Sequence, residues 1–183
     1  MMHRKLALAL ALPTLLLAGC NGDAPAVDET QMELDSTVAT LLNGQDELST
    51  TAGMIAEAGL APVLDAAPSY TLLAPTDTGF TAFDTAAEDE ASGPDRTAVM
   101  AALMRGHLLP GYVTLADIEQ ALDASDNSSV TMQTMAETPL TFTREGDAVK
   151  VTAADGASAL LAGGDVSGGN GVILPIDGVL KTL

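Results

Sequence analysis

Several residue types are scarce in this sequence, and each shortage removes a class of protein from consideration. The chain has one Cys, no Trp and 3% aromatic residues. It can therefore form no intrachain disulfide and no zinc site built on several thiolates, and we expect no stacking platform for bases or sugar rings. With 7 Lys and Arg against 25 Asp and Glu, neither nucleic acid nor an anionic lipid surface is an expected partner, because phosphates require clustered cations.

Apolar residues, by contrast, are plentiful. Of the 183 residues, 47% are hydrophobic and 17% are charged, which supplies a core and leaves too little charge for a disordered tail. At about 100–200 residues per domain, this length allows one domain and some additional segments. The sequence therefore predicts a single folded domain.

The N-terminus has the pattern of an export signal. Residues 1–5 include His3, Arg4 and Lys5, residues 6–17 are apolar apart from Pro13 and Thr14, and small residues follow. This pattern is typical of a secretory signal peptide, and the apolar run is shorter than the roughly 20 residues that span a bilayer. The segment Leu17-Ala18-Gly19-Cys20 resembles the lipobox of bacterial lipoproteins. The resemblance implies cleavage before Cys20 and lipid on its sulfur and new amine; the alternative is an ordinary signal peptide with a chance Cys.

This signal divides the chain into three predicted parts. Residues 1–19 form the signal peptide, 20–35 hold the lipidated Cys and an acidic flexible tether, and 36–183 form the domain. Cleavage removes two basic residues and no acidic one, which changes the formal net charge from −18 to −20. We expect a membrane-anchored, extracytoplasmic protein. Because Asn21 rather than Asp follows the Cys, resemblance to Gram-negative sorting favours the outer membrane, with the protein periplasmic or surface-facing.

Helical spacing of apolar residues dominates the first part of the domain, and short Thr- and Val-rich segments dominate the last part. Helices are predicted from an N-cap at Ser36, at 47–58 before Gly59, at 60–66, at 96–105 before Gly106, and at 114–122. Strands are predicted at 70–74, 130–135, 140–144, 149–152, 157–161 and 172–176, with hairpin turns at 145–147 and 154–156. Helices first and strands later indicate an α+β fold.

Two residues could be mistaken for catalysts. Asp77-Thr78-Gly79 matches the aspartic protease triplet, but that chemistry needs two carboxylates that share a proton. A capping role for Asp77 or Thr76, on a short helix that carries Phe80 and Phe83, explains the motif better. His107 is the one His of the mature chain, and no nucleophile or orienting carboxylate is marked for it, so a structural role is favoured. We therefore predict no enzyme, no metal site and no cofactor.

Three segments together resemble the signatures of fasciclin (FAS1) domains. They are YTLLAPTDTGF at 70–80, GHLLPG at 106–111, and Asp165-Val166 followed by NGVILPIDGVL at 170–180. The residues that carry the match are Thr71, Ala74, Pro75, Thr76, Asp77, Phe80, His107, Pro110, Gly111, Asp165, Asn170, Gly171, Val172, Ile173, Ile176 and Asp177. The resemblance implies a wedge of short β-strands flanked by helices, and a role in adhesion.

Particular structural roles follow for these residues. We expect 71–74 to be a core strand that Pro75 ends, and Asn170-Gly171 to be a turn with positive φ that leads into the last strand. Pro175 within that strand suits an edge or irregular position. Gly106 stands where the family often has a Tyr linked to integrin binding in animal members, so the animal receptor is not carried over.

The predicted function is adhesion, or interaction with a protein or matrix component, by one FAS1 domain at the cell surface. Because the mature chain is strongly anionic, a basic partner is favoured over divalent cations that bridge loop carboxylates. Two alternatives remain open. The first is a solute- or lipid-binding envelope lipoprotein, which requires a large apolar pocket; the more remote one is a hydrolase that uses Asp77 or His107.

Overall fold

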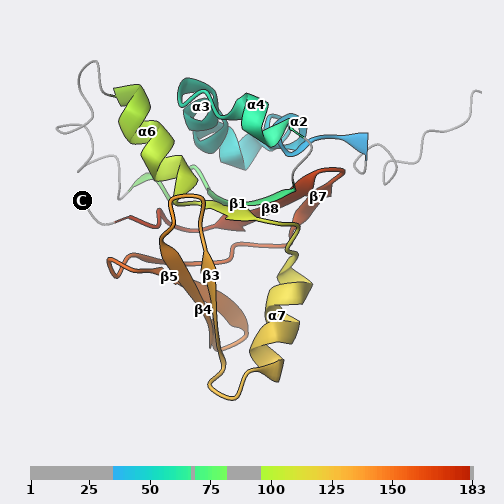
Figure 1. Cartoon of the computed structure of the whole chain (residues 1–183), viewed down its shortest axis with the longest axis vertical. Helices are drawn as coiled ribbons and strands as arrows, with labels where there is room; N and C mark the ends of the chain where they lie inside the picture. The colour runs from blue at the N-terminus through green and yellow to red at the C-terminus, as the bar shows by residue number, and fades with distance from the viewer. Residues whose placement is uncertain (1–34, 67–68, 82–95, 182–183) are drawn as a thin grey trace, which may run out of the picture.

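The computed structural model describes residues 35–66, 69–81 and 96–181. Phe83, Cys20 and the predicted tether as far as residue 34 lie outside these residues. The described chain forms three layers: a group of helices, a central four-stranded sheet and a second four-stranded sheet (Figure 1). We name the central sheet, with the order β2-β1-β8-β7, sheet A, and the other, with the order β3-β4-β5-β6, sheet B.

Sheet A is built around two parallel strands, β1 (Tyr70–Pro75) and β8 (Gly171–Ile176). Two short antiparallel strands, β2 (Leu108–Pro110) and β7 (Val166–Gly168), pair with their outer sides. Every residue of β8 is buried. Such an uninterrupted apolar run is typical of a strand covered on both faces of its sheet.

The alternation of side chains along these strands divides the core into two parts. Leu72 and Ile173 belong to a cluster with the helices, whereas Leu73 and Leu174 belong to a cluster with sheet B. These residues are opposite one another in the β1–β8 register, and neighbouring side chains of a strand point to opposite faces. Sheet A is therefore the shared wall of two hydrophobic cores.

The helices of the first core are short. They are α2 (Val38–Leu42), the 3₁₀ turn η1 (Asp46–Leu48), α3 (Ser49–Glu57), α4 (Ala61–Leu64) and α6 (Arg96–Arg105). The predicted bounds of α6 are confirmed, and Gly59 follows α3 with φ +66°, which suits a helix stop. The N-cap of α2 is Thr37, whose hydroxyl accepts from the amide of Thr40, so the prediction of Ser36 is wrong by one residue.

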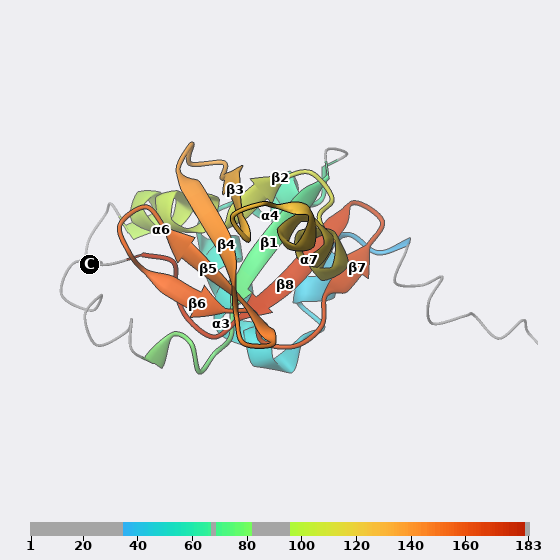
Figure 2. The same cartoon turned by 90° about the horizontal axis from the view of Figure 1, so that it is seen from below.

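Sheet B is an antiparallel meander that packs against sheet A through one face (Figure 2). Its strands are β3 (Ser129–Gln133), β4 (Pro139–Glu145), β5 (Ala148–Ala153) and β6 (Ser158–Leu160), and helix α7 (Leu115–Ala124) contacts β3 and β4. Gly146 and Gly156 have positive φ in the two predicted hairpin turns. Both turns are thereby confirmed, and the fold is α+β with its helices mostly N-terminal.

Strands β2 and β7 were not predicted, and Pro175 has the irregular of the two expected environments, an edge or an irregular position. β8 has β1 on one side and β7 on the other, so Pro175 is not in an edge strand. However, β7 pairs with β8 only as far as Ile173. The Pro175 carbonyl accepts from the amide of Ala162, away from β1. The backbone nitrogen and carbonyl of a strand residue point to the same side, so the nitrogen of Pro175 also points away from β1. Proline has no amide proton to donate, and for this reason no hydrogen bond between β1 and β8 is lost.

In the part of the chain that the structure describes, no helix is long and apolar enough to cross a membrane.

Candidate functional site

Thr71 holds the loop between β2 and α7 against sheet A. It is buried, its hydroxyl accepts from the amide of Val113 at 2.9 Å, and it donates to the Gly111 carbonyl at 3.0 Å. Gly111 has φ +105°, a conformation that favours glycine, and Pro110 before it lies opposite Tyr70 in the register. The signature residues of two distant segments thus meet here and serve the fold.

Asp77 caps a different helix from the one predicted. Its carboxylate accepts from the backbone amide of Thr50 and from the hydroxyl of Ser49, each at 2.8 Å, at the start of α3. The amide of Asp77 in turn donates to the Glu47 carbonyl. Thr76, rather than Asp77, caps the turn after β1, because its hydroxyl accepts from the amide of Gly79. Asp77 therefore joins the end of β1 to α3.

The environment of Asp77 also determines its acidity. The amide of Thr50 and the hydroxyl of Ser49 stabilise the charged form and hold the pKa of the Asp77 carboxyl below its usual range. An aspartic protease needs the opposite arrangement, in which two neighbouring carboxylates share one proton. The contacts of Asp77 are those of a helix cap.

Phe80 and the glycine before it secure the turn after β1. Phe80 is buried, and its amide donates to the Thr76 carbonyl. A Cβ atom on Gly79 would lie 2.9 Å from the backbone carbonyl of Asp177. The turn therefore packs directly on the backbone that follows β8, and only glycine allows this approach.

Asn170 and Gly171 do not have the positive φ that was predicted for them. The Asn170 side chain instead connects three elements: its oxygen accepts from the amide of Val38 at 2.8 Å, and its nitrogen donates to the carbonyls of Leu64 and Ala66. Position 171 requires glycine, because the Cβ atom of any other residue would overlap the Tyr70 carbonyl. The pair is thus explained by side-chain hydrogen bonding and close packing.

His107 is a buried connector between α6 and the C-terminal segment. Its Nδ1 is 2.9 Å from the Leu103 carbonyl, and its Nε2 accepts from the amide of Leu180 at 3.0 Å. This pairing assigns the proton to Nδ1, because Nε2 must be the acceptor. Burial lowers the pKa of His107 to about 4, so the imidazole is neutral at pH 7. The Leu103 and Leu180 contacts are structural.

The remaining signature residues are divided between the core and the surface. Ala74, Val172, Ile173 and Ile176 are buried in sheet A. Asp165 accepts from the hydroxyl of Ser167, and Asp177 accepts from the amide of Leu160 at 2.6 Å, which ties β6 to the end of β8. The matched residues therefore line sheet A and its connections, and they do not converge on one site.

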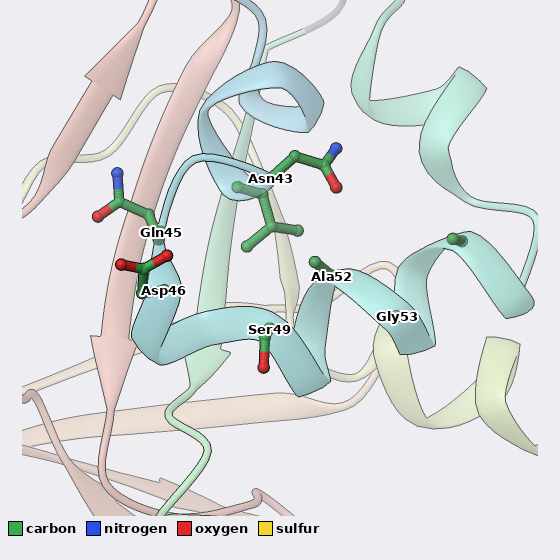
Figure 3. Close-up of a pocket in the computed structure, with 8 residues that line it drawn as sticks. Asn43, Gln45, Asp46, Ser49, Ala52 and Gly53 are labelled. Atoms are coloured by element: carbon green, nitrogen blue, oxygen red, sulfur yellow. The ribbon is translucent and has the colours of Figure 1, made fainter.

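One open depression lies on the helical layer, away from the space between the sheets (Figure 3). Its volume is about 330 Å³. Its lining residues are Leu42, Asn43, Gln45, Asp46, Ser49, Ala52, Gly53 and Ala56. The wall is mixed in polarity, and the Ser49 hydroxyl is already bonded to Asp77. This depression is not the large apolar pocket that a lipid ligand requires.

Charged side chains form pairs at the surface. Four ion pairs are present among the described residues: Arg96–Glu57, Arg144–Asp123, Lys150–Glu145 and Lys181–Asp155. Residues 35–66, 69–81 and 96–181 contain no group of three or more His, Cys, Asp or Glu side chains that could hold a metal ion. Among the described residues, 16 Asp and Glu side chains stand against 5 Lys and Arg side chains, so the described surface is largely anionic.

The arrangement defines a small α+β domain of two packed sheets, in which the signature residues hold the fold together. The family model of the fasciclin domain matches residues 46–182. The chain belongs to this family, so the resemblance found in the sequence is confirmed.

Two similar proteins agree with this assignment. The chain is 28% identical over 174 residues to Protein sll1483 of the cyanobacterium Synechocystis sp., covering 94% of this chain and 89% of that protein. The fold is similar to a solved FAS1 domain pair from the insect cell adhesion molecule Fasciclin I, with a TM-score of 0.69 and 20% identity. That match covers 81% of this chain and 52% of the other, so the chain spans about half of the insect structure.

Proposed function

We propose that the protein is a lipid-anchored extracytoplasmic protein that presents one FAS1 domain for adhesion, or for interaction with a protein or matrix component. The proposal is carried by one observation: the polar signature residues form hydrogen bonds inside the domain. Thr71, Asp77, His107 and Asn170 all have their polar groups bonded to other parts of the domain. The family features therefore specify a rigid scaffold, and the function belongs to its outer surface.

A binding role is favoured over catalysis by the same contacts. Asp77 is engaged by α3, and His107 is buried between Leu103 and Leu180. A general base must reach a substrate proton by direct hydrogen bond or through one water molecule. Neither residue is free for that role, so we assign no catalytic residue and no cofactor.

Membrane anchoring rests on the sequence around Cys20. The lipobox-like segment contains the single Cys of the chain. Several acyl chains together hold a protein firmly in a bilayer, at about 0.8 kcal/mol per buried CH₂ group, whereas one chain gives marginal binding. The outer membrane is the favoured location, because Asn21 follows the Cys.

Charge favours a basic partner. Each copy of the mature chain would carry about 20 net negative charges, so binding to a basic protein should weaken steadily as NaCl is added. Association through bridging divalent cations should instead require millimolar Ca²⁺ or Mg²⁺ and disappear with a chelator. A salt and chelator titration of cell attachment distinguishes the two modes.

The anchor is tested with the substitution Cys20→Ser in the full chain. We expect the variant to be released from membranes or to accumulate as precursor, and we expect attachment of the cells to fall with it. The matched control is Ser36→Ala, which changes a hydroxyl outside the predicted lipobox. A Cys20→Ser protein that is still processed and membrane-bound would show that the lipoprotein assignment is wrong.

A further inference from the structure

Four hydroxyl side chains lie in one row across sheet B. Thr131 of β3 is opposite Thr141 of β4, Thr141 is opposite Thr152 of β5, and Thr152 is opposite Ser158 of β6. Directly opposite residues share a face of the sheet. Neighbouring strands lie about 4.8 Å apart. We call these residues the hydroxyl row; it extends about 14 Å across the sheet, the length of three strand spacings.

The hydroxyl row faces away from the core. Its neighbours along the strands, Phe142 and Val151, are buried between the two sheets, so the row lies on the opposite, outward face. Thr131 and Ser158 at its ends are exposed, and the central Thr141 and Thr152 are partly exposed. The Thr131 and Thr141 hydroxyl oxygens are 3.4 Å apart. The four residues thus place a row of hydroxyl groups on the outward face, exposed at its ends and partly exposed at its centre.

This face is electrically neutral, in contrast to the rest of the chain. The outward positions of β3 to β6 carry one basic and one acidic residue, Lys150 and Glu145, and these two form an ion pair at 2.8 Å. The chain as a whole has a formal net charge of −18. Within sheet B, the outward face is therefore a place where a partner would meet hydroxyl groups and no unbalanced charge.

We propose that the hydroxyl row is a binding surface for an uncharged polysaccharide chain. This inference goes beyond the proposed function, because it adds an uncharged partner class, bound at a separate face, to the basic partner favoured there. Hydroxyl groups both donate and accept, so the row can match the hydroxyls of sugar units in either orientation. The face is open, and its outward strand positions carry no aromatic ring. Affinity must therefore come from many weak contacts along a polymer.

Charge also selects among possible occupants. A polyanionic polysaccharide would be repelled by the surrounding carboxylates. A second copy of the chain would add its own negative charge and would bury little apolar surface, since Leu160 and Pro139 are the larger apolar side chains at the outward positions. An uncharged polymer meets neither obstacle.

The experiment measures retention of the purified full-length chain, kept in detergent, on three insoluble uncharged glucans: amorphous cellulose, curdlan and starch. The test variant is Thr131→Val, Thr141→Val and Thr152→Val combined, which removes three hydroxyls and keeps the β-branched shape. The matched control combines Thr78→Val, Thr81→Val and Thr97→Val, because these threonines are exposed outside sheet B.

We expect the wild-type chain to be retained on at least one glucan, the control to match it within twofold, and the test variant to bind at least fivefold more weakly. Retention should be almost independent of NaCl, unlike binding to a basic partner. If the test variant has a lowered thermal midpoint, Thr131→Arg at the exposed end of the row replaces it, with the same expectation.

Two results would overturn the inference: no retention of the wild-type chain on any of the three glucans, or equal retention of the wild-type chain and the sheet B variant. Neither result contradicts the proposed function. The proposed function is contradicted if cells that lack the protein attach as well as wild-type cells, or if Cys20→Ser leaves membrane association unchanged.

Discussion

Sheet A and sheet B differ in what their residues do. Sheet A is covered on both faces, and the three fasciclin signatures lie on its strands, its turns and the segments attached to them. Sheet B is covered on one face, and its outward side carries threonines and serines that match no signature. The comparison separates the residues that specify the fold from those that are free to recognise a partner.

The difference has a physical origin. A residue in sheet A, such as Thr71, must satisfy its polar group inside the protein, because an unpaired buried group costs about 1–3 kcal/mol. An outward residue of sheet B, such as Thr141, is only partly buried and can bond to water. Substitutions should therefore be costly in sheet A and cheap on the outward face of sheet B.

The largest effect is expected at Phe80, in the turn that follows β1. Phe80 is 2% exposed, so Phe80→Ala leaves a cavity and should lower the free energy of unfolding by about 3–5 kcal/mol. Tyr112→Ala is the matched control, because Tyr112 is 42% exposed; it should cost less than about 1 kcal/mol. Urea denaturation measures both. Equal midpoints would show that Phe80 is not a core anchor.

An effect of similar size is expected from pH at His107. The pKa of His107 is about 4 when folded and 6.5 when exposed. The unfolded chain therefore binds the proton more readily. The stability that depends on neutral His107 is complete above pH 6.5 and is lost as the pH falls from 6.5 to 4, by about 3 kcal/mol in total.

This pH effect is checked by comparing unfolding of the wild type and His107→Gln between pH 7 and pH 4. The difference between them removes the contribution of the carboxylates, and we expect the variant to lack the His107 slope. As a second measurement on the wild type, the NMR signals of the His107 ring should not titrate between pH 7 and pH 5. A ring that titrates near pH 6.5 would contradict the buried contacts.

The smallest effect is expected when the same change, Thr to Val, is made once in each sheet, and this pair of variants tests the comparison most directly. Thr71→Val removes a buried hydroxyl that serves Gly111 and Val113, and it should cost about 2 kcal/mol. Thr141→Val removes an outward hydroxyl and should change stability by less than about 0.5 kcal/mol. Thermal unfolding of the two variants gives the result. Similar losses in both would mean that the sheets do not differ in this way.

The sequence by itself determined those features that depend on interactions between residues close together along the chain. The helix at Arg96–Arg105 and the hairpin turns at Gly146 and Gly156 were predictable, since helical hydrogen bonds join residues four apart and a tight turn depends on one residue that accepts positive φ. The family was also predictable, because its three signatures stand in order along the chain.

Tertiary structure decided which distant groups meet. Strands β2 and β7 have three residues each and exist as strands only because β1 and β8 lie beside them. Asp77 was expected to cap its own turn, yet it caps α3, and Asn170 bonds to α2 and to the end of α4. Local spacing cannot choose among such partners, because the donors and acceptors come from segments more than 25 residues away. The hydroxyl row has the same origin: its threonines are scattered along the sequence, and only the strand register aligns them.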